Sequence, residues 1–394
     1  MNSIYLYNGP DEDFENFIKE NYLEENSIAR RLYFRDVIQS IDQINLETIM
    51  EEMKKENKEY EVILVIKTED FFSIKDHFTE KLMDRINSWI EKNYIITAVI
   101  QNPPKVFLNK LNKLESENKI ELIKDKFELK SITKENLKEI VIKIKQRIIG
   151  QDQIIKQIVA SLYLSANSKK NKPVVLMFYG PPGVGKTETV NIISEVINNT
   201  KAFRQQLSMF KTKEFSDYMF GSEIHSKALS KDLIRNNSNV ILLDEFNQCP
   251  EYIYSSFFQM FDEGYFEDFN YKVDLTNSII ICTANFDSLQ EIQDRIGPAL
   301  YSRFNHFIQF NDLNIKDKET LIYLKYNEII QDFSEQEKEF IEKQNLLSNL
   351  ILMADKFSDV RNIHNGLRMF LSKVLAEELI IETLGLNKDE KEAN

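Results

Sequence analysis

One stretch near the middle of the chain limits its possible folds more than any other feature. Residues 180–187 read GPPGVGKT and fit the pattern G-x-x-x-x-G-K-[ST]. The apolar run VVLMFY at positions 174–179 predicts a buried strand before this pattern, and residues 188–197 predict a helix after it. Glycines let backbone N–H groups turn toward phosphate oxygens, and a helix start adds the positive end of its dipole. This context predicts a phosphate-binding loop at the edge of a parallel α/β sheet.

The residues of this loop have distinct expected roles. Lys186 is expected to reach the β- and γ-phosphates of a nucleotide, and the hydroxyl group of Thr187 is expected to bind Mg²⁺. A chance match in a glycine-containing turn is the alternative, and the flanking strand and helix argue against it. The predicted nucleotide-binding residues of this segment are Pro182, Gly183, Val184, Gly185, Lys186, Thr187 and Glu188.

A second element delivers two carboxylates at the end of a strand. Residues 240–245 read VILLDE, so four apolar residues predict a buried strand that ends at Asp244 and Glu245. Ligand sites of open parallel sheets lie at the carboxyl ends of the strands. Asp244 is expected to bind nucleotide-associated Mg²⁺, and Glu245 is expected to act as the general base for an attacking water. A strand followed by a plain acidic turn is the alternative, and the upstream phosphate loop disfavours it.

A third strand is predicted to end in a polar amide. Residues 279–285 read IIICTAN, and Asn285 is expected to donate to the γ-phosphate or to orient the water together with Glu245. This element is weak alone, because asparagine commonly closes a strand. Cys282 lies within the apolar run and is expected to be a packed core residue.

These three elements, in this order, resemble an AAA+ module with its Walker A and Walker B motifs. The surrounding sequence resembles the second ATPase module of the Clp disaggregases and unfoldases, as in residues 257–264 (FFQMFDEG) and 274–277 (DLTN). Residues 148–152 (IIGQD) resemble the family's opening Ile-Gly-Gln, which implies that Ile149 and Gly150 lie at the adenine. The resemblance covers roughly residues 145–375 and implies ATP and Mg²⁺ as ligands and ATP hydrolysis as the reaction.

Two arginines take their expected roles from this resemblance. Residues 297–304 (GPALYSRF) resemble the family's Pro-Glu-Phe-Leu-Asn-Arg segment, which implies that Arg303 is an arginine finger for the ATP of a neighbouring subunit. Residues 359–362 (DVRN) resemble the Gly-Ala-Arg segment of the helical lid, which implies that Arg361 contacts the γ-phosphate of its own subunit. Asp-Val replaces Gly-Ala here, and a surface ion pair is the ordinary alternative for either arginine.

The resemblance also bears on substrates. The family grips polypeptide with an aromatic loop that precedes the acidic strand, and Phe220 and Gly221 fall near that place. The family's aromatic-Val-Gly order is not kept, so half-buried positions for Tyr218 and Phe220 are an equal alternative. Peptidase-docking members carry an Ile-Gly-Phe or Ile-Gly-Leu loop after the Asn-ended strand. Only the short link 286–296 lies there, so docking to a barrel peptidase is not expected.

The remaining chain predicts two further parts. Apolar runs at 4–7, 62–66 and 95–100 alternate with helical patterns and predict a separate N-terminal α/β domain with a parallel sheet, residues 1–130. Residues 8–10 (NGP) follow the first run, where a phosphate loop could lie, but no Lys-Ser/Thr pair follows and a plain turn is expected. Residues 131–312 are expected to form the AAA+ core, and residues 313–394 a helical lid with a polar tail from 388.

Composition limits the partners. A net charge of −13 disfavours broad binding to nucleic acid or to anionic membranes. No apolar run approaches the roughly 20 residues of a membrane span, and no signal peptide is visible. The two cysteines, Cys249 and Cys282, and the four histidines show no metal-site spacing. A cytoplasmic location is therefore expected.

Taken with the resemblance, these features predict an ATP-dependent protein-remodelling ATPase that acts as a ring, expected to be a hexamer, on a protein substrate of unknown identity. The alternative is an ATP-driven oligomerisation switch or scaffold that presents the N-terminal domain to a partner without threading a substrate. The altered pore loop and the unmatched N-terminal domain favour this alternative. A clamp-loader-like role on DNA is disfavoured by the acidic balance.

Overall fold

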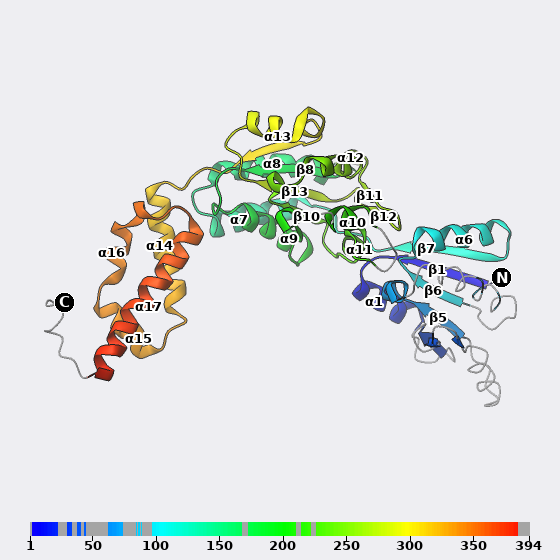
Figure 1. The fold of residues 1–394 in the computed structure, drawn as a ribbon, viewed down its shortest axis with the longest axis horizontal. Coiled ribbons are helices and arrows are strands. Elements are labelled where there is room, and N and C mark those ends of the chain that lie inside the picture. Colours follow the sequence, from blue (N-terminus) through cyan, green and yellow to red (C-terminus); the bar gives the residue numbers. More distant parts are fainter. Residues whose placement is uncertain are drawn as a thin grey trace.

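The computed structural model has three parts, which follow one another along the longest axis of the molecule (Figure 1). A central part and an N-terminal part each contain a five-stranded sheet, and the C-terminal part is helical. The described residues are 2–22, 30–33, 38–40, 43–44, 62–73, 84, 86, 88, 97–167, 172–209, 214–221 and 226–384. Residues 95 and 96 of a predicted strand, and the predicted polar tail, lie outside this set.

The central part is built on five strands in the order β14-β8-β13-β10-β9, with all neighbours parallel. The strands are β8 (Val174–Tyr179), β9 (Phe203–Gln206), β10 (Val240–Asp244), β13 (Ile279–Ala284) and β14 (His306–Gln309). Every residue of β8, β10 and β13 is buried, because helices cover both faces of the sheet. The carboxyl ends of the strands meet at one edge, where residues 180–187 begin.

The central strands direct alternate side chains into two layers. Leu176, Leu242 and Ile281 pack on one face with α7 (Lys134–Arg147), α8 (Asp152–Asn167) and α9 (Lys186–Asn198). The opposite face packs against a second layer rich in phenylalanine. The elements of that layer are η1 (Leu207–Met209), α10 (Glu214–Phe220), α11 (Leu229–Ile234), η2 (Phe246–Gln248), η3 (Glu251–Ser256), α12 (Phe257–Asp262), the hairpin β11 (Tyr265–Glu267) and β12 (Lys272–Asp274), and α13 (Leu289–Tyr301).

The N-terminal part contains a second fully parallel sheet, in the order β2-β5-β6-β1-β7. Its strands are β1 (Asn2–Asn8), β2 (Arg30–Tyr33), β5 (Val62–Ile66), β6 (Thr97–Gln101) and β7 (Ile120–Lys126). Its other elements are α1 (Asp11–Tyr22), α4 (Thr68–Ser73), α6 (Lys105–Ser116) and the antiparallel pair β3 (Ile38–Ser40) and β4 (Gln43–Ile44). The parallel sheet predicted for this region is present.

The C-terminal part is a group of helices around one apolar cluster. Asn314 and Ser334 begin two of the helices with capping boxes. In each box the first side chain accepts a hydrogen bond from the backbone N–H three residues later, and the side chain of that later residue accepts one from the first backbone N–H. The helices are α14 (Ile315–Ile330), α15 (Glu335–Lys343), α16 (Leu346–Leu352), η4 (Ala354–Lys356) and α17 (Val360–Leu384). Within the described ranges, no helix combines the length and the apolar character needed to cross a membrane.

Candidate nucleotide-binding site

A cavity of about 660 Å³ lies at the carboxyl edge of the central sheet, between that sheet and the C-terminal helices. It is walled by the ends of three neighbouring strands, by residues 182–188 and by α14 and α17. All but one of the nucleotide-site residues predicted to act within their own subunit line it directly. Those that line it are Ile149, Pro182, Gly183, Val184, Gly185, Lys186, Thr187, Glu188, Asp244, Glu245, Asn285 and Arg361; Gly150 is adjacent in sequence, and Arg303 lies elsewhere.

The backbone of the loop has the conformation that a phosphate cradle needs. Gly183 has φ of +71° and Gly185 has φ of +101°, values that L side chains rarely adopt. A Cβ atom on Gly183 would meet Oδ1 of Asp359 at 2.5 Å, so the loop also touches the first residues of the lid helix. The backbone N–H of Val360 donates to the carbonyl of Gly183 at 3.3 Å. Loop and lid are therefore in direct contact.

Lys186 lies at the start of α9 and is only 7% exposed. Its Nζ donates to the carbonyl oxygens of Gly180 (2.5 Å) and Pro181 (2.6 Å) and to Oδ1 of Asn285 (2.9 Å). Burial lowers the pKa of Lys186 to about 8; the Asp244 carboxylate opposes this shift and Arg361 adds to it. The structure thus joins two predicted residues, one at the start of α9 and one at the end of β13. A phosphate would compete with these three oxygens for the ammonium group.

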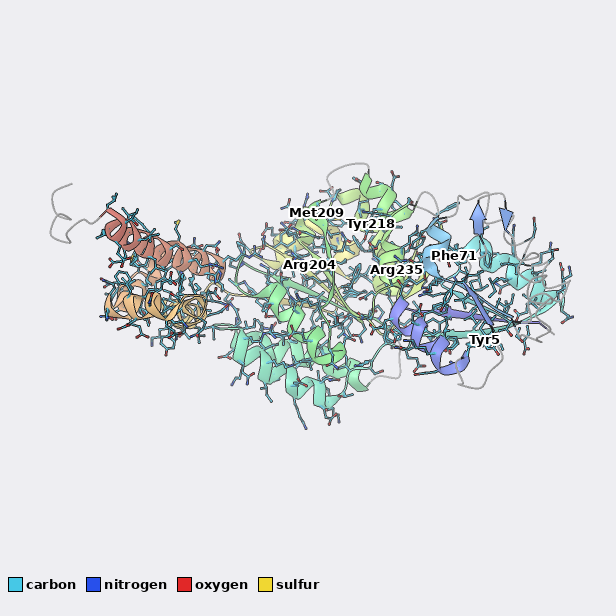
Figure 2. The ribbon with its side chains drawn as sticks, turned by 90° about the horizontal axis from the view of Figure 1, so that it is seen from below. Tyr5, Phe71, Arg204, Met209, Tyr218 and Arg235 are labelled. Carbon is cyan, nitrogen blue, oxygen red and sulfur yellow. The ribbon has the colours of Figure 1, made fainter. Side chains whose placement is uncertain are left out.

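Asp244 ends β10 and is almost fully buried. Oδ1 accepts a hydrogen bond from the hydroxyl group of Thr283, and Oδ2 accepts from Nε (2.9 Å) and Nη2 (2.6 Å) of Arg204. Arg204 lies on β9 and lines the same cavity in the central part of the molecule (Figure 2). It was not predicted, and a lone arginine on a short strand carries little signal in the sequence.

Glu245 follows directly and has a left-handed backbone, with φ of 57°. Nε2 of Gln206 donates to its Oε2 at 3.0 Å, and its backbone N–H donates to the hydroxyl group of Thr283 at 3.2 Å. Hydrogen bonds from Ser208 and Gln206 lower the pKa of the Glu245 carboxyl group. The group is therefore ionised at neutral pH and held in place, as a proton acceptor must be. Neither Gln206 nor Ser208 was predicted.

The opening segment of the core is fixed beside the cavity by paired hydrogen bonds. Nε2 of Gln151 donates to the carbonyl of Asn311 at 2.7 Å, and the N–H of Asn311 donates to Oε1 of Gln151 at 3.0 Å. Ile149 lines the cavity and packs against the apolar cluster of the C-terminal helices, which includes Leu321. Leu324 also lines the cavity. This apolar end is suited to the flat face of a base.

An ion-pair bridge closes another wall of the cavity. Arg147, at the end of α7, pairs with Glu188, and its Nη1 lies 2.6 Å from Oε2 of Glu195. These contacts raise the pKa of Arg147, chiefly through the hydrogen bond to Glu195. Glu188, although predicted to contact nucleotide, is thus engaged by Arg147.

The donor set fits Mg²⁺-nucleotide. Magnesium is usually held by one or two carboxylates together with phosphate oxygens, and here one buried carboxylate, Asp244, faces the cavity that Thr187 also lines. Among the described residues, no group of three or more His, Cys, Asp or Glu side chains is placed to hold a metal ion alone. A magnesium ion here would take its other ligands from phosphate oxygens and from water.

Sequence comparisons agree with this geometry. The family model described as "AAA domain (Cdc48 subfamily)" matches residues 171–343. The Clp protease ATP-binding subunit ClpE of Bacillus subtilis (strain 168) is 25% identical over 291 residues, 62% of this chain and 42% of ClpE. The chaperone protein ClpB of Malacoplasma penetrans (strain HF-2) is 27% identical over 311 residues, 68% of this chain and 43% of ClpB. Residues 171–343 thus match an AAA domain, and the chain is similar over this region to Clp-type AAA+ ATPases.

A third relative, the Clp protease ATP-binding subunit ClpL of Staphylococcus aureus (strain bovine RF122 / ET3-1), is 28% identical over 211 residues, 48% of this chain and 30% of ClpL. The chain spans less than half the length of these relatives. The AAA+ family and the Clp ATPase relatives support ATP hydrolysis by this domain.

Arg303 lies outside the cavity of the AAA+ domain. Its Nε donates to Oδ2 of Asp262 at 2.7 Å, and its guanidinium lies 4.2 Å from the ring centre of Phe258. The Arg303 side chain is 25% exposed. Arg303 does not line the cavity of its own subunit, and it makes the surface ion pair that is the ordinary alternative for such an arginine.

The predicted substrate-binding pair also lies apart from the cavity. Phe220 ends α10 with 48% of its surface exposed, and its carbonyl accepts from the N–H of Phe269 at 3.0 Å. A Cβ atom on Gly221 would lie 2.9 Å from Oδ2 of Asp268. Tyr218, by contrast, is partly buried and donates to Oε1 of Gln205 at 2.8 Å. Both side chains are partly covered, as the half-buried alternative expects, and Phe220 is the more exposed of the two.

Proposed function

We propose that this chain is an ATP-dependent protein-remodelling ATPase that works as a ring oligomer, with Mg²⁺ bound beside the nucleotide. The observation that carries the proposal is the convergence of Lys186, Glu245 and Asn285 on one cavity closed by Arg361 of the lid. The remodelling part of the proposal is based on relatives that are described as a Clp ATP-binding subunit and as a chaperone. We retain the division 1–130, 131–312 and 313–394, since α7 begins at Lys134 and α14 at Ile315.

The geometry supports a division of labour among the cavity residues. Lys186 and the loop N–H groups bind the phosphates, and Thr187 and Asp244 hold the metal. Mg²⁺, when bound, neutralises developing charge on the phosphate oxygens. The ionised Glu245 accepts the proton of the attacking water, and Asn285 orients that water or the γ-phosphate. Because Arg204 occupies Oδ2 of Asp244, the guanidinium group must release that oxygen before a metal can use it.

The test of the ATPase part is Glu245→Gln. The variant keeps the size of the side chain and loses the proton acceptor, so it should bind ATP as well as the wild type and hydrolyse it at least about 100-fold more slowly. Binding is measured with a fluorescent ATP analogue, and hydrolysis by phosphate release. Hydrolysis at the wild-type rate would remove Glu245 from the role of base.

One contact supports the alternative function, a nucleotide switch that does not thread a substrate. Nζ of Lys105 in the N-terminal part donates to the carbonyl of Asp268, in the turn between β11 and β12. The next residue of this turn, Phe269, donates its N–H to the carbonyl of Phe220, so the turn links the N-terminal part to the predicted grip residues. Phe220→Ala separates the two functions. Threading predicts that remodelling of a model unfolded protein falls at least ten-fold with intact ATPase activity. An unchanged remodelling rate in Phe220→Ala favours the switch; Phe269→Ala, its exposed neighbour, serves as the matched comparison.

A further inference from the structure

The two five-stranded sheets in the described part of the chain share one strand order. In the central sheet the strands run fifth, first, fourth, third, second in chain order: β14-β8-β13-β10-β9. Counting only the strands of the N-terminal sheet, its order β7-β1-β6-β5-β2 is the same, and all neighbours are again parallel. Both sheets are visible in Figure 1 on either side of α11. An order this specific allows strand-by-strand comparison of the two parts.

When the strands of the two sheets are matched, three N-terminal segments take the positions that the elements of the ATP site take in the central sheet. β1 corresponds to β8, so residues 9 and 10, between β1 and α1, stand where residues 180–185 stand between β8 and α9. β6 corresponds to β13, so Asn102 follows its strand as Asn285 does. β5 corresponds to β10, so Lys67 follows its strand where Glu245 follows Asp244. The edge that binds nucleotide in one sheet therefore exists in the other.

In the N-terminal sheet this edge is closed by its own side chains. The N–H of Gly9 donates to Oδ1 of Asn102 at 2.9 Å, and Nδ2 of Asn102 donates to the carbonyl of Gly9 (2.8 Å) and to Oγ1 of Thr68 (2.9 Å). Nε2 of Gln101 donates to the same carbonyl at 3.0 Å, and Oε1 of Gln101 accepts from the N–H of Thr68 at 3.1 Å. Gln101, Asn102 and Thr68 are all 0% exposed.

The charges at this edge oppose phosphate. The first turn of α1 carries Asp11, Glu12 and Asp13, and Oδ1 of Asp11 accepts from Nε2 of Gln101 at 2.9 Å. Carboxylates at a helix start stabilise the helix through its dipole, which is the interaction that a bound phosphate would otherwise make. The loop holds two residues in place of six and contains no lysine.

The same edge faces the ATPase core. Oδ2 of Asp11 lies 3.7 Å from Nε of Arg235, and Nζ of Lys126 lies 3.4 Å from Oδ2 of Asp274. Residues 8–10 and 126–129 share a cavity of about 350 Å³ with residues of α11 and β12. Figure 2 shows Arg235 and Phe71 on the two sides of this boundary.

We propose that the N-terminal domain is a second P-loop-type unit that binds no nucleotide, and that its sealed phosphate edge is a permanent docking surface for the ATPase core. Oδ1 of the buried Asn102 accepts from the N–H of Gly9, which is the kind of hydrogen bond that a phosphate oxygen would accept from the loop of the central part. The chain accordingly holds one nucleotide, although it contains two sheets of the same order.

Nucleotide counting tests the first half. Full-length protein carrying Glu245→Gln is titrated with fluorescent ATP analogue and Mg²⁺, with and without Lys186→Ala. We expect no more than one nucleotide per chain, and loss of saturable binding when Lys186 is removed. A second nucleotide, or one that survives Lys186→Ala, overturns the inference. Absence of binding to the Glu245→Gln protein would instead overturn the proposed function, so the two failures are distinguishable.

Hydrogen exchange tests the second half. In the wild type, ATP should slow exchange in residues 180–190 and leave exchange in residues 4–12 and 98–104 unchanged. Faster exchange in those N-terminal segments would mean that the edge leaves the ATPase core, and slower exchange would mean that it binds ATP; either result would overturn the inference. This comparison needs no variant.

A substitution pair tests the seal itself. Asn102→Asp keeps the shape but replaces the amide donor by an oxygen, so exchange at Gly9 and Thr68 should quicken at least about ten-fold. The control is Asn118→Asp, the same change at another left-handed but exposed asparagine, which should exchange as the wild type does. ATPase rates of both should stay within two-fold of the wild type. Equal exchange in the two variants would show that Asn102 does not close the edge.

Discussion

At the scale of single residues, the site depends on charged groups that are buried among polar neighbours. Lys186 is protonated at neutral pH although burial disfavours its charge, and three acceptor oxygens compensate for the lost water. Asp244 and Glu245 lie side by side in sequence, yet Arg204 pairs with the first and Gln206 with the second. Neighbouring carboxylates thus acquire different partners and different expected tasks, metal binding and proton acceptance.

The pKa of Lys186 predicts a pH dependence of nucleotide affinity. Its folded-state pKa of about 8 lies below the ordinary 10.5, and a bound phosphate favours the charged form. At pH 9 only about a tenth of the free protein carries the charge, so ATP affinity should fall roughly ten-fold between pH 7.5 and 9. Titrations with a fluorescent ATP analogue at each pH measure this. An affinity that is constant over this range would contradict the low pKa.

The control for that experiment is the stability of the protein. Between about pH 8 and 10.5, the unfolded chain holds more protons at Lys186 than the folded chain does, so this group's contribution to the free energy of unfolding rises with pH. Weaker binding at pH 9 should therefore occur without unfolding caused by Lys186, which circular dichroism at both pH values checks.

At the scale of elements, the phosphate loop and the lid helix α17 share one carboxylate. Oδ1 of Asp359 accepts from the backbone N–H groups of Arg361 (2.8 Å) and Asn362 (3.0 Å), and so caps the helix. The same side chain packs on Gly183. The Asp-Val pair that departs from the family's Gly-Ala thus has a structural role, because it joins lid and loop.

Gly183→Ala tests this junction. The new methyl group meets a positive φ and the Asp359 side chain at 2.5 Å, and Asp359 cannot move without uncapping α17. We expect a loss of about 2–4 kcal/mol in the free energy of unfolding, together with weaker ATP binding. Denaturant unfolding and nucleotide titration give the two values.

Gly297→Ala is the matched control for this prediction. Gly297 has φ of +77°, but a Cβ atom there has nothing within 4 Å, so the substitution adds backbone strain without crowding. It should destabilise by only about 1–2 kcal/mol. Equal losses in the two variants would mean that the contact between Gly183 and Asp359 carries no energy.

At the scale of the whole molecule, ATP hydrolysis is expected to depend on assembly. Arg303 is 25% exposed and separate from its own cavity, as a residue that acts on a neighbouring subunit would be. Stabilisation of the transition state by an arginine in trans is worth about 10³–10⁵ in rate. Arg303 would have to break its ion pair with Asp262 before it could contact the ATP of a neighbouring subunit.

Arg303→Ala should therefore reduce ATPase activity at least about 1000-fold at concentrations where the wild type assembles, with ATP affinity within a few-fold. Mixing it with Glu245→Gln subunits should restore activity, because each supplies what the other lacks. Asp262→Asn, which breaks the same ion pair and keeps the arginine, is the control and should remain active. Full activity of Arg303→Ala in the assembled state would refute the trans role.

The strands that the sequence predicted are β1, β5, β6, β8, β10 and β13, each of which contains an apolar run. β5, β8, β10 and β13 are continuous apolar runs, so local composition reveals them. β7 reads IELIKDK and β9 reads FRQQ, and both lie at sheet edges where only part of each strand is covered. Their pattern resembles that of a loop, because half-exposed strands tolerate charge.

What the sequence determined by itself is local: the phosphate loop, the carboxylates of Asp244 and Glu245 and the end of β13 at Asn285, since each depends on residues within one strand-loop-helix unit. Only the tertiary structure decided which side chains meet across strands. Arg204 reaches Asp244, and Asn102 closes the loop at Gly9, because parallel pairing brings together residues 40 and 93 positions apart. The repeated strand order of the two sheets belongs to the same level, because pairing between distant strands is not encoded in any short segment.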